Sequence, residues 1–235
     1  MLRGVNLAVG EGQSMVVIGG SGTGKSVLLK HVIGLLKPDS GRVEVDGTVI
    51  HELGYRQIAG FRRRFGMAFQ EGALFDSMTV AENVGFPLRR RGMARAEIAE
   101  RVAECLASVG LEEAAAKLPS ELSGGMRRRV GFARAIAHRP RILLFDEPTT
   151  GLDPVTKGTI DDLIVELKES LSSTTLTITH DMASVFRIAD RVAMLYDGEI
   201  IANLPPEELR RSRDPRVREF LRGVPGPEAG QENPT

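Results

Sequence analysis

Hydrophobic and polar positions alternate at the start of the chain and then give way to longer apolar runs. The alternation over residues 5–9 predicts a β-strand, and the apolar run over residues 15–18, which follows a turn at Glu11-Gly12, predicts a second one. Residues 27–36 are apolar on nearly all sides, which is typical of a buried helix, and Lys37-Pro38 should end it. The chain therefore begins with two strands and a helix, and a glycine-rich loop precedes the helix.

The middle of the chain has a different pattern. Residues 42–50 predict a hairpin that turns at Asp46-Gly47. Amphipathic spacing then covers residues 94–109 and 126–137, where apolar side chains recur at helical intervals. We therefore expect a helical subdomain over about residues 71–137.

Strand patterns return in the last third of the chain. Residues 142–145, 175–179 and 191–196 predict strands, and the last of them should pair through Asp197-Gly198 with residues 199–203. The length fits one domain, which we place at residues 1–222. The end of the chain, residues 223–235, is rich in Pro, Gly and Glu and is predicted to be a disordered tail.

Composition narrows the classes of function. The 31 basic and 31 acidic residues give a formal net charge of zero, so no long-range attraction for nucleic acid is expected, and a nucleic-acid partner is not predicted. The single cysteine, Cys105, lies on an apolar helix face and is interpreted as core packing in a reducing compartment. No run approaches the roughly 18 apolar residues of a membrane span, and the first residues do not resemble a signal peptide. We expect a soluble, cytoplasmic protein.

The glycine-rich loop has the pattern of a phosphate-binding site, and it lies between an apolar strand and a helix. Its residues are Gly19, Gly20, Ser21, Gly22, Thr23, Gly24, Lys25 and Ser26. Glycines let the backbone wrap closely round a polyphosphate, so that main-chain N–H groups and the helix N-terminus face its negative charge. We expect Lys25 to reach the β- and γ-phosphates and Ser26 to bind Mg²⁺. A flexible Gly/Ser turn is the alternative, and the flanking strand and helix argue against it.

An acidic pair ends the apolar run at residues 142–145. Asp146 is expected to be the second ligand of Mg²⁺. Glu147 follows it and is placed to polarise the water that attacks the γ-phosphate. Acidic residues after a strand also cap helices, but the presence of a phosphate loop favours the catalytic interpretation.

A short motif in the predicted helical subdomain identifies a family. Residues 122–126 read Leu-Ser-Gly-Gly-Met, which closely resembles the Leu-Ser-Gly-Gly-Gln signature of the ABC ATPases. Gln70, the segment 151–153 and His180 stand in that family's order, and the resemblance covers nearly the whole chain. It implies an α/β fold: a P-loop NTPase core with a mixed sheet, an antiparallel β subdomain and an inserted helical subdomain.

The resemblance also implies roles for these residues. Glu147, His180 and Gln70 would be catalytic: His180 would contact the γ-phosphate and orient the water with Glu147, and Gln70 would sense the γ-phosphate and join Ser26 and Asp146 at the metal. The nucleotide site would also include residues outside the P-loop, namely Ser123, Gly124, Gly125 and Asp153. The helix that Ser123 opens would direct its positive end at an ATP held by a second copy of the chain in a head-to-tail dimer.

Further details resemble one branch of the family. Met126 with the run 127–130, together with residues 76–84 and 86–88, is similar to the ATPases of phospholipid transport that maintain lipid asymmetry. That branch implies an integral membrane permease, an MCE-domain protein and a small STAS-domain protein as partners, and a place on the cytoplasmic face of the inner membrane. Stretches between residues 206 and 221 are similar to it too. The arginine runs 62–64, 89–91 and 127–129 are interpreted as solvated or subunit-facing surfaces.

Other functions of the same fold stay open. An amino-acid importer or a multidrug exporter would use the same nucleotide machinery, because no motif found here contacts a transported substrate. A non-transport ABC ATPase, such as one in iron–sulfur assembly, would instead purify with soluble partners.

The sequence departs from the family pattern at its start. ABC ATPases usually stack the adenine on an aromatic residue before the P-loop, but residues 1–18 contain no Phe, Tyr, Trp or His. The edge strand that normally precedes also has no counterpart. We expect that the natural chain begins about 20 residues further upstream.

Overall fold

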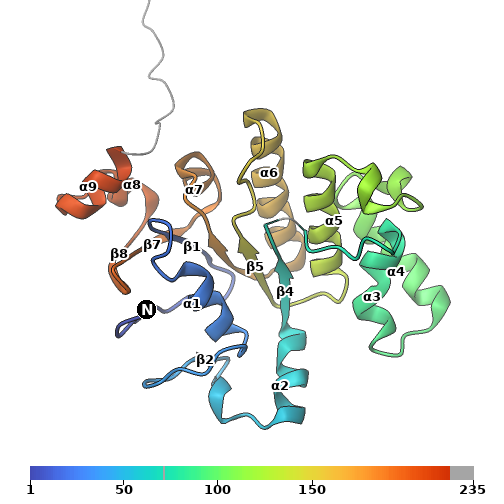
Figure 1. Cartoon of the computed structure of the whole chain (residues 1–235), viewed down its shortest axis with the longest axis horizontal. Coiled ribbons are helices and arrows are strands. Elements are labelled where there is room, and N and C mark those ends of the chain that lie inside the picture. Colours follow the sequence, from blue (N-terminus) through green and yellow to red (C-terminus); the bar gives the residue numbers. More distant parts are fainter. Residues whose placement is uncertain (71, 223–235) are drawn as a thin grey trace, which may run out of the picture.

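A computed structural model describes residues 1–70 and 72–222, so the predicted tail at 223–235 lies outside the described residues. Within these residues six strands form one sheet in the order β4-β5-β6-β1-β7-β8 (Figure 1). The strands are β1 (Ser14–Ile18), β4 (Phe65–Ala68), β5 (Ile142–Asp146), β6 (Thr174–Ile178), β7 (Arg191–Tyr196) and β8 (Glu199–Leu204). All neighbours are parallel except β7 and β8, so the sheet is mixed, as predicted.

Parallel strands bring their carboxyl ends to one edge of the sheet. The register pairs Ile18 of β1 with Met194 of β7, and it pairs Ile178 of β6 with both Val17 of β1 and Asp146 of β5. The segments that follow β1, β5, β6 and β7 therefore emerge side by side. These are the segments that carry the predicted phosphate loop, the acidic pair and the histidine.

Helices cover both faces of the sheet. Their bounds are α1 (Lys25–Val32), α2 (Tyr55–Phe61), α3 (Val80–Arg89), α4 (Arg95–Ala107), α5 (Gly124–Ile136), α6 (Pro154–Leu171), α7 (Met182–Ile188), α8 (Pro206–Arg210) and α9 (Pro215–Arg222). Short 3₁₀ turns occur at Ile50–Glu52, Arg62–Arg64, Glu112–Ala114 and Pro119–Glu121. Among the described residues, no helix is both long and apolar enough to span a membrane.

Two hydrophobic clusters hold the sheet between them. Val16 and Ile18 of β1 face the larger cluster, which includes side chains of α3 to α9, whereas Met15 and Val17 face the smaller one, which includes α1. Every residue of β1 is buried, because a parallel strand covered on both faces has no solvated side. Cys105 lies in the larger cluster, and burial raises the pKa of its thiol to about 11. Its predicted core position is confirmed.

The helical region stands at the far end of the sheet from α8 and α9 (Figure 1). Thr79 caps α3: its hydroxyl accepts the N–H of Glu82, whose carboxylate accepts the N–H of Thr79. The side chain of buried Asn83 bonds Phe75 and Met78 and fixes the loop before this helix. The helix α5 returns from this region to the core and packs on β4.

Two predicted elements differ from the structure. Residues 5–9 form no strand, because this segment pairs with no strand that the structure describes. Val5, Leu7 and Val9 pack on the smaller cluster, so the alternation of apolar and polar residues reflects which side chains are buried. The helix predicted to reach residue 36 ends at Val32, because Gly34 takes a φ of 67° and the N–H groups of residues 35 and 36 turn back to the carbonyl of Lys30. The predicted hairpin is present as β2 (Glu44–Val45) and β3 (Thr48–Val49).

Candidate active site

The phosphate loop joins β1 to α1 and touches β7. Gly19 has a φ of 152°, and a Cβ built on it would lie 2.3 Å from the carbonyl oxygen of Leu195. Gly24 precedes the helix with a φ of 107°, and its Cβ would lie 2.9 Å from the side chain of Leu2. Both positions favour glycine because their φ angles are positive. At Gly19 a side chain is also excluded, because the carbonyl oxygen of Leu195 occupies the place of its Cβ.

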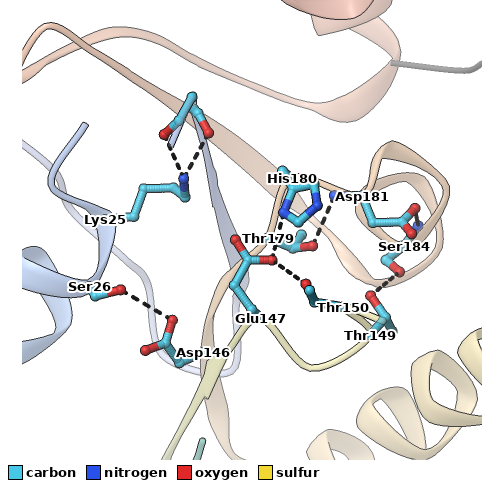
Figure 2. Close-up of polar contacts among 12 residues, drawn as sticks. Lys25, Ser26, Asp146, Glu147, Thr149, Thr150, Thr179, His180, Asp181 and Ser184 are labelled. Atoms are coloured by element: carbon cyan, nitrogen blue, oxygen red, sulfur yellow. Dashed lines mark hydrogen bonds and ion pairs between the residues drawn. The ribbon is translucent and has the colours of Figure 1, made fainter. Parts of the chain in front are cut away.

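Lys25 holds its ammonium group over the loop. Its Nζ donates to the carbonyls of Gly19 at 2.8 Å and Gly20 at 2.9 Å, and the residue is only 8% exposed (Figure 2). Burial lowers the pKa of Lys25, and the attraction of Glu147 and Asp146 opposes that shift. The loop therefore holds a positive charge with little water around it. The attraction between this ammonium group and a phosphate oxygen is stronger there than in open solvent.

Ser26 and Asp146 bring two hard oxygen donors together across the sheet edge. The hydroxyl of Ser26 donates to Oδ1 of Asp146 at 3.4 Å. Burial and the neighbouring charge of Glu147 raise the pKa of Asp146, and a cation beside it would relieve both effects. No group of three or more His, Cys, Asp or Glu residues in the described part of the chain could hold a metal. This donor set fits Mg²⁺, which takes few protein ligands and completes its shell with phosphate oxygens and water.

Glu147 is held in one orientation by two hydrogen bonds. Its Oε2 accepts from Thr150 Oγ1 and from His180 Nδ1, both at 2.9 Å (Figure 2). Its backbone is left-handed, with a φ of 50°, while its N–H bonds the carbonyl of Ile178 at 2.9 Å. A non-glycine residue in this conformation costs about 1–3 kcal/mol, and such strain clusters at functional sites. Both bonds involve Oε2, which leaves Oε1 to face a reactant.

A second set of contacts supports the histidine loop. The carboxylate of Asp181, next to His180, caps α7 by accepting the N–H groups of Ala183 and Ser184. Asp181 also pairs with Lys157 of α6. Ser184 bonds the hydroxyl of Thr149 at 3.1 Å, with both side chains buried, so the loop after Glu147 and the helix after His180 are joined.

Most of the predicted residues meet at one cavity. It measures about 900 Å³, and the loop residues 19–26, Gln70, Glu147 and His180 line it. Asp146 is not among the residues that line the wall, whereas its hydrogen-bond partner Ser26 is. The structure thus brings together residues that are up to about 160 positions apart in the sequence.

Other predicted residues lie outside this cavity. Ser123, whose hydroxyl accepts the N–H of Met126, caps α5 in the helical region, and Gly124 and Gly125 form its first turn. Asp153 caps α6 by accepting the N–H groups of Val155 and Thr156. A hydrogen bond with the side chain of Thr156, together with these backbone bonds, lowers the pKa of Asp153. None of these four residues lines the cavity of the phosphate loop, and their contact with a nucleotide stays a prediction.

Sequence reasoning missed several supporting residues. Thr149, Thr150 and Ser184 have no pattern that separates them from other loop or helix residues. Arg128 was interpreted as part of a solvated or subunit-facing run, and this is wrong: the residue is 8% exposed and donates to the carbonyls of Gln70 and Thr150. The signal that could have found it is its position on the same face of α5 as buried Ala135, seven residues on.

Two of the other histidines, His31 and His138, have hydrogen-bond partners in the backbone. His31 bonds the carbonyl of Val27 at 2.8 Å, and His138 bonds that of Phe65 at 2.9 Å. Burial lowers the pKa of His138. Neither lines the cavity of the P-loop.

Comparison with known proteins gives consistent matches. A family model described as ABC transporter matches residues 2–150. The chain is 43% identical over 220 residues to the intermembrane phospholipid transport system ATP-binding protein MlaF of Haemophilus influenzae, covering 93% of this chain and 83% of that protein. It is 45% identical over 227 residues to the methionine import ATP-binding protein MetN of Caulobacter vibrioides, covering 96% and 68%.

A third relative extends well beyond the match. The probable ribonucleotide transport ATP-binding protein mkl of Mycobacterium tuberculosis is 42% identical over 220 residues, and the match covers 93% of this chain but 61% of that protein. Among solved structures, a dimeric post-hydrolysis state of the ATP-binding cassette MJ0796 bound to ADP and Pi superposes with a TM-score of 0.80. Its identity is 35%, and the match covers 87% of this chain and 90% of that one.

Proposed function

Since the chain belongs to the ABC transporter family, we propose that it is the ATP-hydrolysing subunit of a membrane transporter. The observation that carries this proposal is the position of Glu147, which faces the cavity of the phosphate loop with its carboxylate fixed by His180 and Thr150. A carboxylate held beside a phosphate-binding loop is the arrangement that hydrolysis of a nucleoside triphosphate requires.

The residues divide the work of hydrolysis between them. The N–H groups of the loop and Lys25 bind the phosphates and neutralise charge that moves onto them as the bond to the γ-phosphate breaks. Oε1 of Glu147 orients the water and accepts its proton. His180, tied to Glu147 through Nδ1, has Nε2 left for the γ-phosphate. Ser26, Asp146 and Gln70 would hold Mg²⁺, which supplies charge neutralisation between the phosphates.

The signature residues require a second copy of the chain. Ser123, Gly124 and Gly125 lie at the N-terminus of α5, outside the cavity of the same chain, so their helix can address only a nucleotide bound elsewhere. A head-to-tail dimer places each signature over the partner's phosphate loop. The dimeric state of the cassette MJ0796 supports this arrangement. Loss of the γ-phosphate then removes a bridge between the subunits, and hydrolysis becomes opening of the dimer.

Phospholipid is the proposed cargo. The resemblance of Met126, residues 127–130 and residues 76–88 to the lipid branch supports it, as does the likeness to MlaF. The chain would work on the cytoplasmic face of the inner membrane, bound to an integral permease and assembled with MCE-domain and STAS-domain proteins. Amino-acid import is the second candidate, because the likeness to MetN is as close.

Two measurements test the proposal. Purified chain should hydrolyse MgATP, and the Lys25→Ala variant should bind none, since no other side chain of the loop carries a positive charge. A tagged chain extracted from native membranes in mild detergent should then retain a permease, an MCE-domain protein and phospholipid, identified by mass spectrometry. A permease with a solute-binding protein would favour the importer, and soluble partners alone would reject transport.

A further inference from the structure

A row of buried polar side chains lies where α6, α7 and the loop after β5 meet. Thr149 is 0% exposed, Ser184 1% and Asp161 3%. The two helices that carry Asp161 and Ser184 pack together, and Ile160 of α6 and Val185 of α7 both belong to the larger hydrophobic cluster. A polar group buried in such a place costs free energy unless it is hydrogen-bonded. The bonds of this row therefore determine whether it holds the three segments together.

The three side chains form one chain of hydrogen bonds. The hydroxyl of Ser184 bonds the carboxyl group of Asp161, and its oxygen lies 3.1 Å from Oγ1 of Thr149 (Figure 2). Since a hydroxyl group has a single proton, Ser184 donates it to the carboxyl group and accepts the proton of Thr149. Asp161 therefore orients Ser184, and Ser184 holds Thr149.

The Thr149 end of this row fixes the loop after Glu147. Thr149 directly precedes Thr150, whose Oγ1 donates to Oε2 of Glu147 at 2.9 Å. The backbone of Glu147 is left-handed, with a φ of 50°, and a conformation of this kind persists only where the surrounding contacts determine it. Thr149 supplies such a contact, because its side chain is fully buried and bonded to another element.

The Ser184 end reaches the same carboxylate from the other side. The N–H of Ser184 donates to Oδ1 of Asp181 at 3.3 Å. Asp181 directly follows His180, whose Nδ1 bonds Oε2 of Glu147 at 2.9 Å (Figure 2). The start of α7, which carries Ser184, is therefore fixed to the loop that carries the histidine.

We propose that Thr149 and Ser184 are positioning residues for hydrolysis, because their buried hydrogen bond joins the two loops that orient Glu147. One loop supplies Thr150 and the other supplies His180, and both side chains bond the same carboxylate oxygen. This inference rests on the proposed function, in which Glu147 accepts the proton of the attacking water. Neither Thr149 nor Ser184 lines the cavity, so both act through Glu147 and not on the nucleotide. Without their bond the loops move independently, and the carboxylate spends less time in the orientation that hydrolysis requires.

Substitutions of Thr149 separate the hydrogen bond from the packing of the side chain. Thr149→Val keeps the shape but lacks the hydroxyl, whereas Thr149→Ser keeps the hydroxyl and loses a methyl group. In Thr149→Val the turnover number should fall about tenfold, while the affinity for ATP changes less than about twofold, because the phosphate loop is untouched. Thr149→Ser should retain at least about half of the turnover. Phosphate release measures turnover, and titration calorimetry without Mg²⁺ measures affinity.

Substitution of Ser184 tests the other partner of the bond. Ser184→Ala should lower turnover by a similar factor, and the double variant with Thr149→Val should be no slower than either single variant, since both remove one interaction. Ser173→Ala is the matched control. Ser173 is fully buried, its hydroxyl donates to the carbonyl of Pro140 at 2.8 Å, and it does not line the cavity. This variant loses a buried hydrogen bond elsewhere and should keep the turnover of the unchanged chain.

The outcomes distinguish this inference from the proposed function. If Thr149→Val hydrolyses ATP as fast as the unchanged chain, or if Thr149→Ser is as slow as Thr149→Val, the hydrogen bond does not position Glu147. Effects of Thr149→Val and Ser184→Ala that multiply in the double variant would also overturn the inference, as would an equal loss of turnover in Ser173→Ala. If Ser184→Ala does not fold, the two variants of Thr149 still decide. An unchanged chain that hydrolyses no MgATP would overturn the proposed function, and this inference with it.

Discussion

The Nε of Arg128 donates to the backbone carbonyl of Gln70 at 2.7 Å and ties the helix that follows the signature to the loop that precedes the helical region. The same guanidinium donates through Nη2 to the carbonyl of Thr150, in the loop after Glu147. One buried side chain thus connects three segments that are separate in the sequence. Movement of α5 would be transmitted through it to Gln70 and to the residues that orient Glu147.

The first prediction concerns this connection. In Arg128→Gln, the buried carbonyls of two loops lose a charged donor, at a cost of about 1–3 kcal/mol each in stability. Turnover of ATP should fall more than about tenfold, while ATP affinity changes by less than about threefold, because the phosphate loop is not touched. Arg129→Gln is the matched control, since the neighbouring arginine bonds the carbonyl of Val109 instead. Equal effects of both substitutions on turnover would show that Arg128 has only a structural role.

The second prediction concerns Glu147. Glu147→Gln keeps the size of the side chain and its contacts with Thr150 and His180, but it cannot accept the proton of the attacking water. We expect ATP binding to persist, hydrolysis to fall by about 100-fold or more, and a closed dimer to accumulate with MgATP. Phosphate release and light scattering after size-exclusion chromatography measure these effects. Hydrolysis at the rate of the unchanged chain would exclude Glu147 as the main catalytic carboxylate.

The central strands and the phosphate loop could be predicted from the sequence because local rules determine them. The run at 15–18 and the strand at 191–196 are apolar over most of their length, and the loop pattern between a strand and a helix has few other uses. The segment at 5–9 shows the limit of such rules. Its alternation of apolar and polar residues predicts which side chains are buried. Formation of a strand also requires a neighbouring strand to pair with, and the local pattern gives no information about that neighbour.

The supporting residues of the site could not be predicted for a related reason. Ser184 and Thr149 meet only because β5 and β6 are neighbours in the sheet, so their contact is a property of topology. Side chains that depend on long-range contacts carry no local signature.

The third prediction tests the dimer. Ser123 lies outside the cavity of its own chain, so Ser123→Arg should leave ATP binding by the monomer within about twofold and prevent closure of the dimer. Binding is measured by calorimetry, and closure by chromatography of the double variant that also has Glu147→Gln. If the variant loses both ATP binding and dimer formation, the substitution has caused misfolding, and a role of Ser123 in trans is contradicted.

The last prediction concerns Asp161, a carboxyl group 3% exposed in the contact between α6 and α7. Burial raises its pKa to about 6, in opposition to a hydrogen bond with Ser184, and the nearby charge of Asp181 adds to the increase. Among the described residues its Oδ1 has no hydrogen-bond partner. A buried carboxylate with one unsatisfied oxygen is costly, so the protonated form suits this site.

The effect on stability has a definite sign. Between the unfolded pKa of 3.8 and the folded pKa of about 6, the native state binds more protons at Asp161 than the unfolded chain does. The free energy of unfolding therefore decreases as the pH rises through this window, by about 1.4 kcal/mol between about pH 5 and about pH 8 from this group alone.

Asp161→Asn removes the titration while keeping the shape of the side chain. Urea unfolding should find the variant more stable than the unchanged chain at about pH 8, by up to about 3 kcal/mol, and by only about half as much at about pH 5. Asp162→Asn is the control, because that neighbouring carboxylate is half exposed and paired with Arg187. If the difference in stability between Asp161→Asn and the unchanged chain is the same at both pH values, the buried carboxyl does not titrate in this range.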